Sequence, residues 1–336
     1  MNKKLISLAV AAAFAAPMAA SADATLYGKL HASIDQVDNG SVDNWQMNSR
    51  ASRLGVKGSE DLGGGLKAIW QIELGIAVDG NCGSTFGQTG CNGIESQRNT
   101  FVGLSGGWGT ALIGRHDTPN KMAFYGAGTE IQGDSILDLN SGVVGVFAKS
   151  DFRADNAIAY VSPNFSGFTL AAAAIPGENG GPATGAPDNS GDSIADHYSF
   201  GGMYAGGGLK VGAGYESKVL GAQNRDEEIM QIGASYNFSG FTVGGHYETV
   251  DDRNGNQGDE QESYAVIGKY AFGNNSIHAV YSDTDSGDSE AYDAYGIGAD
   301  HAFSNRTKVY AAYASRDYNG TTEDDDQFSL GVVHNF

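Results

Sequence analysis

Apolar and polar residues alternate along most of this chain with a period of two. Residues 25–35 and 327–336 show the alternation most clearly, because every second position there is apolar or small. Similar runs occur at residues 66–76, 198–204, 209–216, 241–247, 264–272, 277–281, 295–303 and 309–316. A period of two is typical of β-strands with one apolar face. The sequence therefore predicts an all-β protein.

Two kinds of connection alternate between these strands. Short turns rich in Gly and Asn lie at residues 60–65, 106–109, 162–167, 205–208, 237–240, 273–275 and 304–306. Longer polar segments lie at residues 37–48, 79–95, 116–152, 177–195, 218–225, 251–260, 284–289 and 317–326. Seven turns and eight loops join sixteen strands. This arithmetic predicts a transmembrane antiparallel β-barrel with short periplasmic turns and long external loops.

Aromatic residues collect beside the short turns, on the apolar face of the strands. They are Trp108, Phe165, Phe168, Phe238, Phe241, Phe272, Phe303 and Phe336. The turn at residues 162–170 is nearly repeated at residues 235–243, as soluble β-sandwiches also repeat a favourable turn. A soluble barrel would expose these rings to water, whereas an outer-membrane barrel uses them as an interfacial girdle. The pattern therefore favours the outer membrane of a Gram-negative bacterium.

The first 22 residues have the pattern of a cleaved export signal. Lys3 and Lys4 precede an apolar run at residues 5–16, and Ala20 and Ala22 form a cleavage site of A-x-A type. We therefore expect residues 1–22 to be removed and residues 23–336 to form a single outer-membrane β-barrel domain. No later stretch approaches the roughly 20 apolar residues that a transmembrane helix needs.

The composition narrows the class of partner. The chain has 336 residues, with 50 Gly but only 6 Pro, and no G-X-Y repeat, which excludes collagen. Its 40 acidic and 20 basic residues give a formal charge of −20, or −22 once Lys3 and Lys4 are lost. A nucleic-acid partner is not expected, because such proteins present a basic face.

Several blocks resemble the Gram-negative general porins, the trimeric porins of Neisseria and beta-proteobacterial type. The blocks are residues 24–28 (ATLYG), 52–68 (SRLGVKGSEDLGGGLKA), 101–104 (FVGL), 114–115 (GR) and 334–336 (HNF). The resemblance implies a sixteen-strand water-filled barrel, a homotrimer and a third loop folded into the pore. It also implies that the second loop reaches over a neighbouring subunit.

Motifs for catalysis or cofactor binding are weak. Ser105 lies in a G-x-S-x-G match, but a strand follows it, whereas the nucleophile elbow needs a helix. The seven His residues have no metal-ligand spacing, and no nucleotide-binding motif occurs. Residues 283–290 have carboxylates at nearly calcium-loop spacing, but the Gly stands fifth instead of sixth. A solvated loop is favoured there over a divalent cation shared with lipopolysaccharide. We expect no enzyme activity, no resident metal and no cofactor.

Cys82 and Cys91 are the only cysteines, and both lie in the second long loop. Their spacing does not fit a zinc site, and the export signal predicts an oxidising compartment. We therefore expect a local disulfide.

The candidate functional side chains are those that the two-residue period turns into the lumen. Lys29, Arg53 and Arg115 form a basic wall in this register. Arg98 is added to it, although its strand, residues 98–105, is apolar on both faces and gives no clear register. The third loop is longer than the 12–15 residues of ordinary connections and carries Glu130, Asp134 and Asp138. We expect these seven residues to line a pore constriction, with acid facing base across it.

The sequence thus predicts a passive diffusion channel for small hydrophilic solutes and ions. The alternatives are a substrate-specific outer-membrane channel, an outer-membrane hydrolase and an adhesin barrel. Expected partners are outer-membrane lipid and lipopolysaccharide, two further copies of the chain, and the barrel-assembly machinery. The last would read the C-terminal strand, which ends at Phe336 on the apolar face.

Overall fold

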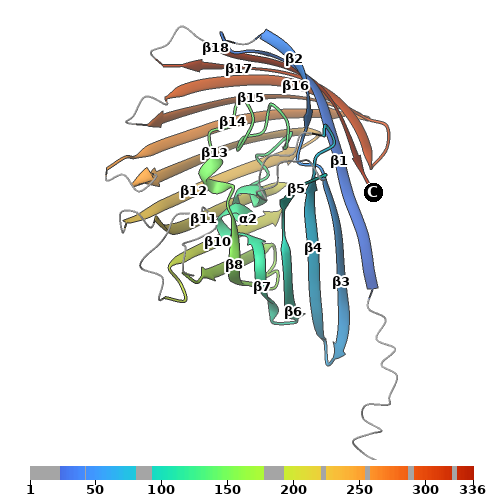
Figure 1. Ribbon diagram of the computed structural model, residues 1–336, viewed down its shortest axis with the longest axis vertical. Helices are drawn as coiled ribbons and strands as arrows, with labels where there is room; N and C mark the ends of the chain where they lie inside the picture. Colours follow the sequence, from blue (N-terminus) through green and yellow to red (C-terminus); the bar gives the residue numbers. More distant parts are fainter. Residues whose placement is uncertain are drawn as a thin grey trace, which may run out of the picture.

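The computed structural model describes residues 23–41, 43–80, 93–177, 193–220, 225–253, 258–286, 291–319 and 324–336. Their strands form one antiparallel sheet (Figure 1). The first nine strands are β1 (Asp23–Asp38), β2 (Asp43–Ser49), β3 (Arg53–Gly63), β4 (Leu66–Ile76), β5 (Ile94–Gln97), β6 (Thr100–Gly106), β7 (Gly109–Asp117), β8 (Arg153–Val161) and β9 (Phe168–Ile175). The others are β10 (His197–Gly206), β11 (Leu209–Leu220), β12 (Arg225–Phe238), β13 (Phe241–Asp251), β14 (Gln261–Phe272), β15 (Asn275–Ser286), β16 (Tyr292–Ala302), β17 (Thr307–Tyr318) and β18 (Asp324–Asn335).

The sheet closes on itself through its first and last strands. One edge of β1 pairs with β18, from Lys29 opposite Asn335 to Asp38 opposite Asp326, and the other edge pairs with β2 and β3. The backbones of Gly28 and Phe336 exchange two hydrogen bonds of 3.0 and 3.1 Å. The predicted sixteen-strand antiparallel barrel is confirmed, with two short strands in addition.

The two additional strands, β2 and β5, correct the predicted loop boundaries. β2 begins within the predicted loop 37–48 and ends one residue beyond it, and β5 begins within the predicted loop 79–95. Each is the outer part of an interrupted wall strand, because β2 and β3 both pair with β1, and β5 and β6 both pair with β4. Other strands also run past their predicted ends, as β11 and β15 do. Ladder hydrogen bonds continue where the apolar face stops, so alternation marks only the membrane-embedded part.

The side chains follow the predicted register. On β1, Leu26 and Ile34 expose 61% and 54% of their surface on the outside, whereas His31 and Ser33 are buried on the inside. The eight aromatic residues beside the short turns are all exposed. A second group of exposed tyrosines, Tyr247, Tyr264, Tyr281 and Tyr295, lies toward the long-loop ends of β13–β16. No helix among the described residues is long and apolar enough to cross a membrane.

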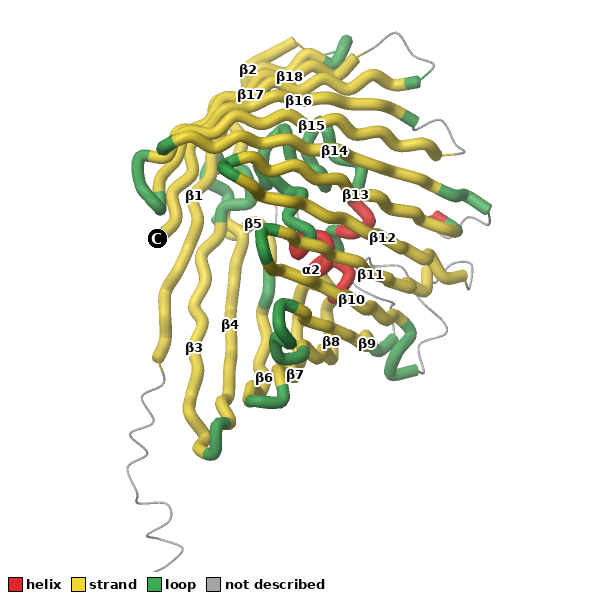
Figure 2. The backbone as a smooth tube through the Cα atoms, turned by 180° about the vertical axis from the view of Figure 1, so that it is seen from behind, coloured by secondary structure: helices red, strands yellow, loops and turns green. Residues whose placement is uncertain are grey.

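The third long loop, residues 118–152, lies inside the barrel (Figures 1 and 2). It begins with helix α2 (Pro119–Gly126) and ends with the 3-10 turn η1 (Ala148–Ser150). Thr118 caps α2 by accepting a hydrogen bond from the Lys121 N–H, and Pro119 suits the first helical turn because its missing N–H would be unpaired there. The helix packs on the inner faces of β10 and β11.

Glycines on the inner face of the wall let the loop come close. A Cβ atom at Gly212 of β11 would lie 1.9 Å from the carbonyl oxygen of Ala123 in α2, and one at Gly201 of β10 would lie 2.2 Å from that of Pro119. At Gly296 of β16 an added Cβ atom would instead meet a side-chain atom, Cδ2 of Leu137, at 2.2 Å. Only glycine permits backbone contacts this close.

An apolar core lies inside the barrel, between the loop and the wall. The loop contributes Phe124, Ile136, Leu137, Leu139, Val143, Val144, Val146 and Phe147, all buried. The wall contributes Ala265, Val280, Ala294, Ala312 and Ala314, among others. Burying these side chains holds the third loop as a folded part of the barrel.

Candidate functional site

Polar contacts attach the second half of the third loop to β15, β16 and β17. The Arg316 guanidinium donates to the carbonyl oxygens of Val143 at 2.8 Å and Gly142 at 3.0 Å. The Ser282 hydroxyl donates to the Val144 carbonyl at 2.7 Å, and the Tyr292 hydroxyl donates to that of Gly145 at 2.5 Å. The backbone polar groups of the buried loop are thereby satisfied by the wall.

The two ends of the loop are attached to β10–β13. The Asn120 N–H donates to the Ser199 hydroxyl at 2.9 Å, and the Gln231 amide donates to the Asn120 carbonyl at 3.0 Å. At the other end, Lys149 pairs with Glu227 at 2.6 Å. The loop therefore lies mainly against β10–β17, and the basic side chains on β1–β8 face it from the remaining wall.

Six basic residues form this basic wall. Four of them lie on β1, β3, β7 and β8, and two lie in the interruptions at residues 50–52 and 98–99. They are Lys29, Arg50, Arg53, Arg98, Arg115 and Arg153. Sequence reasoning placed four of them here and missed Arg50 and Arg153.

Irregularities in the strands carry three of these side chains. Arg50 and Arg98 occupy the interruptions between β2 and β3 and between β5 and β6, and Ala51 beside Arg50 has a positive φ of 48°. Arg115 lies at a register shift between β7 and β8. Bulges and breaks re-aim side chains and are common next to functional sites.

Five of the six basic residues are paired with carboxylates. Lys29 pairs with Asp134 of the loop and Arg115 with Asp155 of β8. The remaining pairs are Arg50 with Asp35 at 2.6 Å, Arg98 with Glu73 at 2.6 Å and Arg153 with Asp117 at 2.9 Å. The charges of these five residues are therefore largely balanced by the carboxylates. The sequence predicted basic side chains at this wall but not these pairings.

Arg53 is the exception. Among the described residues, no carboxylate oxygen lies within 4 Å of its guanidinium and no hydrogen bond joins it to a side chain. It does act on the loop electrostatically. Against the opposing effect of burial, the charges of Lys29 and Arg53 lower the pKa of Asp134. Arg53 thus leaves a net positive charge on this wall.

The three predicted loop carboxylates differ in position. Asp134 reaches the basic wall, at a backbone φ of 60°. Asp138 accepts hydrogen bonds from the N–H groups of Asp134, Asn140 and Ser141, and Glu130 accepts one from Leu139 at 3.0 Å. Glu130 and Asp138 therefore stabilise the loop itself. Among the described residues neither forms an ion pair with the basic wall, and the prediction that they face this wall across the pore stays a prediction.

Burial shifts the pKa values of these two carboxyl groups. Burial and the nearby Asp138 charge raise the pKa of Glu130 well above its usual range. Burial also raises the pKa of Asp138, although the three backbone donors oppose it. Of the three loop acids, Asp134 alone combines a lowered pKa with a basic partner.

Arg50 and Arg153 were missed for different reasons. Arg50 lies in an interruption that the alternation does not reveal. Arg153 begins a strand whose inward positions include Ala157 and Ala159, so its two-residue spacing from Asp155 was a usable signal. Lys121 of α2, which pairs with Asp151 at 2.6 Å and Asp117 at 3.2 Å, was also missed.

The remaining sequence candidates are the catalytic serine motif, the two cysteines, the signal segment and possible metal ligands. Ser105 lies in β6, its hydroxyl is 2.9 Å from that of Thr110 in β7, and a turn and a strand follow it. Cys82, Cys91 and the signal segment 1–22 lie outside the described residues. Within the described residues, no group of three or more His, Cys, Asp or Glu side chains could hold a metal ion.

Comparisons with known proteins agree on one family. The family model described as Gram-negative porin matches residues 7–321. The major outer membrane protein P.IB of Neisseria gonorrhoeae is 31% identical, covering 92% of each chain. Outer membrane porin protein 32 of Delftia acidovorans is 29% identical, covering 94% of this chain and 89% of its own.

Solved structures show the same fold. The anion-selective porin from Comamonas acidovorans has a TM-score of 0.73 at 22% identity, covering 94% of this chain and all of its own. The trimer form of OmpT from Vibrio cholerae has a TM-score of 0.63 at 16% identity, covering 94% and 99%. With a closed barrel, an internal third loop and a matching family model, the chain belongs to the Gram-negative porin family.

Proposed function

We propose that this outer-membrane porin, a passive channel for small hydrophilic solutes and ions, has a modest anion preference set beside its third loop. The unpaired guanidinium of Arg53 carries this proposal, because it is the one member of the basic wall without a carboxylate partner among the described residues. We assign the constriction to Lys29, Arg53, Arg98, Arg115 and Asp134. Glu130 and Asp138 support the loop from within.

The test is conductance of the purified protein in a planar bilayer, with reversal potential under a KCl gradient. We expect stable ion-conducting steps and a reversal potential on the anion side. If a bilayer that contains the folded protein did not conduct, the proposed channel function would be wrong. Conduction with a cation-side reversal potential would overturn only the anion preference.

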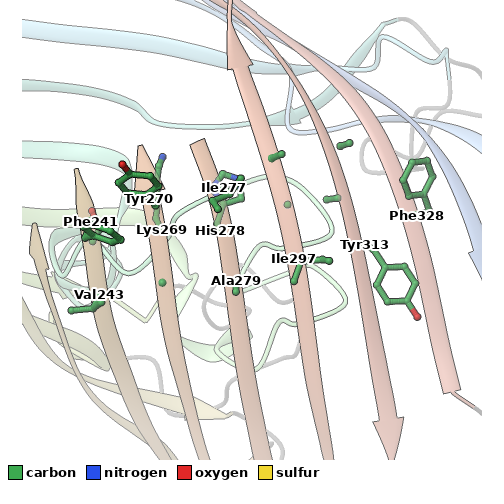
Figure 3. A pocket seen from close by; sticks show the side chains of 16 residues that line it. Phe241, Val243, Lys269, Tyr270, Ile277, His278, Ala279, Ile297, Tyr313 and Phe328 are labelled. Atoms are coloured by element: carbon green, nitrogen blue, oxygen red, sulfur yellow. The ribbon is translucent and has the colours of Figure 1, made fainter. Parts of the chain in front are cut away.

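We also propose a homotrimer. The trimer form of OmpT from Vibrio cholerae, a barrel of the same fold, supports it. The outward face of β13–β18 is compatible with it, because a hollow of about 660 Å³ lies there among apolar side chains such as Phe241, Val243 and Ile297 (Figure 3). A second outward hollow, of about 880 Å³, adjoins it and includes Ile34 and Leu330. Apolar surface of this extent suits both lipid and a neighbouring barrel. A monomer by analytical ultracentrifugation in mild detergent would overturn the trimer.

Two further proposals concern processing and chemistry. Cleavage after Ala22 and a Cys82–Cys91 disulfide are checked together by the intact mass of the exported protein before and after reduction. We propose no hydrolase activity, because the Ser105 hydroxyl is hydrogen bonded to Thr110 between two strands. Lipid or peptide hydrolysis that Ser105→Ala abolishes would overturn this.

A further inference from the structure

A luminal pocket lies on the short-turn side of the third loop. Its volume is about 470 Å³. The loop covers it with residues 128, 130 and 131, which follow α2, and the inner face of β10–β14 forms the rest. Because the short turns of such barrels face the periplasm, a solute leaving the constriction inward passes this pocket.

Two ammonium groups in the pocket form no ion pair with the described residues, although the charge of Asp300 in β16 acts on Lys269. Lys210 of β11 shares the inward face with Gly212, against which α2 packs, and Lys269 of β14 shares it with buried Ala265 and Ile267. No carboxylate oxygen of the described residues lies within 4 Å of either ammonium group. This contrasts with the basic wall, where five of six basic side chains are paired.

Neutral hydrogen-bonding groups line the same pocket. The Asn237 amide donates to the Thr242 hydroxyl oxygen at 2.8 Å, which leaves the hydroxyl hydrogen of Thr242 able to donate. The Ser235 hydroxyl is already used, because it donates to the Ala127 carbonyl at 2.7 Å and holds the end of α2. The pocket thus offers two positive charges and a hydroxyl donor.

Among the described residues that line the pocket, Glu130 is the single acidic one, and it forms no ion pair with either lysine. Its Oε2 accepts from the Leu139 N–H, and its Oε1 is buried with no hydrogen-bond partner among the described residues. Burial raises the pKa of this carboxyl, so the protonated, uncharged form persists to higher pH than for an exposed glutamate.

We propose that this pocket is a transit site for small organic dianions, which pause between Lys210 and Lys269 on the periplasmic side of the constriction. β11 and β14 are three strand spacings apart, roughly 14 Å at the backbone, so a solute with two anionic groups engages both lysines better than a monoanion does. The site rests on the proposed channel function and adds a solute class to it.

The experiment is inhibition of chloride conductance by succinate, a dianion, and by acetate, a monoanion, at matched ionic strength. For the wild-type channel we expect succinate to reduce the chloride current at a concentration about fivefold lower than acetate. The double variant Lys210→Gln/Lys269→Gln should lose most of this difference, and Lys210→Arg/Lys269→Arg should keep it.

The matched control is Lys57→Gln/Lys67→Gln, which removes two luminal lysines from β3 and β4 on the other side of the barrel. It should leave the succinate effect within about twofold of wild type, because exposed charges are screened over about 10 Å. If both double variants lost the difference between succinate and acetate equally, the summed positive charge of the lumen would explain the succinate effect and the proposed site would be wrong. Succinate no stronger than acetate on wild type would also overturn it. A wild-type protein that does not conduct would instead overturn the channel itself, and heat-modifiable electrophoresis checks that each variant is folded.

Discussion

Arg53 and Arg115 both belong to the basic wall, but they differ in pairing. The Arg115 guanidinium is bound to Asp155 and to the Gln97 carbonyl, whereas Arg53 has no carboxylate partner among the described residues. A unit charge about 10 Å from a passing ion contributes about 0.4 kcal/mol in water, or roughly a factor of two in ion preference. Arg53→Gln should therefore reduce the anion-to-cation permeability ratio about twofold.

The matched variant is Arg115→Gln, which should have a smaller effect because it removes a charge that Asp155 already balances. The reversal potential at low and high salt gives the ion selectivity of both variants. The selectivity of the Arg53→Gln/Arg115→Gln double variant should resemble that of Arg53→Gln. An Arg53→Gln channel with unaltered selectivity at both salt concentrations would remove Arg53 from the constriction.

Glu130 makes the stability of the third loop depend on pH. Its pKa is raised in the folded protein, so the stabilisation is complete below the unfolded pKa of about 4.3 and is lost as pH rises through the folded value. Glu130→Gln removes the ionisation and keeps an oxygen that accepts from the Leu139 N–H. We expect the melting temperature of wild type to fall with rising pH and that of Glu130→Gln to fall less.

Thermal melting by circular dichroism between pH 4 and 9 gives this comparison. The control is Glu260→Gln, which changes an exposed carboxylate in an external loop. If wild type and Glu130→Gln have parallel pH profiles, ionisation of Glu130 does not influence the loop.

At the scale of elements, α2 depends on glycines in the strands beneath it. A Cβ atom at Gly212 would meet the Ala123 carbonyl oxygen at 1.9 Å, and backbone cannot yield as a flexible side chain does. Gly212→Ala should destabilise the packed loop by about 1–3 kcal/mol and alter single-channel conductance. Gly268→Ala in β14 is the control, because nothing lies within 4 Å of its added Cβ atom. Equal conductance and melting temperature in both variants would contradict the close packing.

The last strand closes the barrel through its terminal residue. Phe336 exchanges backbone hydrogen bonds with Gly28, and its ring lies over that glycine, where a Cβ atom would come within 2.2 Å. Deleting Phe336 should reduce the yield of folded protein in the outer membrane several-fold, because closure and the proposed assembly signal are both lost. Fractionated membranes and heat-modifiable electrophoresis measure that yield. Deletion of exposed residues 40–41 from the loop between β1 and β2 provides a control, and an unchanged yield without Phe336 would contradict the prediction.

At the scale of the whole molecule, the acidic loops and the lumen act on ions over different ranges. The net negative charge of the chain, −20 over the full sequence, is concentrated at the long-loop ends of the strands, where it enriches cations. Salt screens exposed charges over about 10 Å at 0.1 M and about 3 Å at 1 M. Neutralising Glu323, Asp324, Asp325 and Asp326 should therefore shift selectivity toward anions at low salt and much less at high salt. Reversal potentials at both concentrations test this, and an effect that does not decline with salt would place these charges in the narrow pore.

The sequence by itself determined the barrel, its strand number and the face of each strand that meets lipid. Those features depend on an alternation of apolar and polar residues that repeats in every strand, as Leu26, Leu30 and Ile34 illustrate on β1. The sequence also identified Lys29 and Asp134 as candidates, and the structure joins them in an ion pair. Both could be found from sequence, because the two-residue period of a strand and the length of a loop are properties of a local segment.

Only the tertiary structure decided which charges remain unpaired. Glu130 and Asp138 accept hydrogen bonds from the backbone of their own loop, and Arg115 pairs with Asp155 of the adjacent strand. Arg53 has no carboxylate partner in the part of the chain that the structure describes. The interruptions at Arg50 and Arg98, and the pocket with Lys210 and Lys269, likewise arise where distant segments meet. Ion pairing depends on distances of a few ångströms between such segments, which the period of a single strand does not encode.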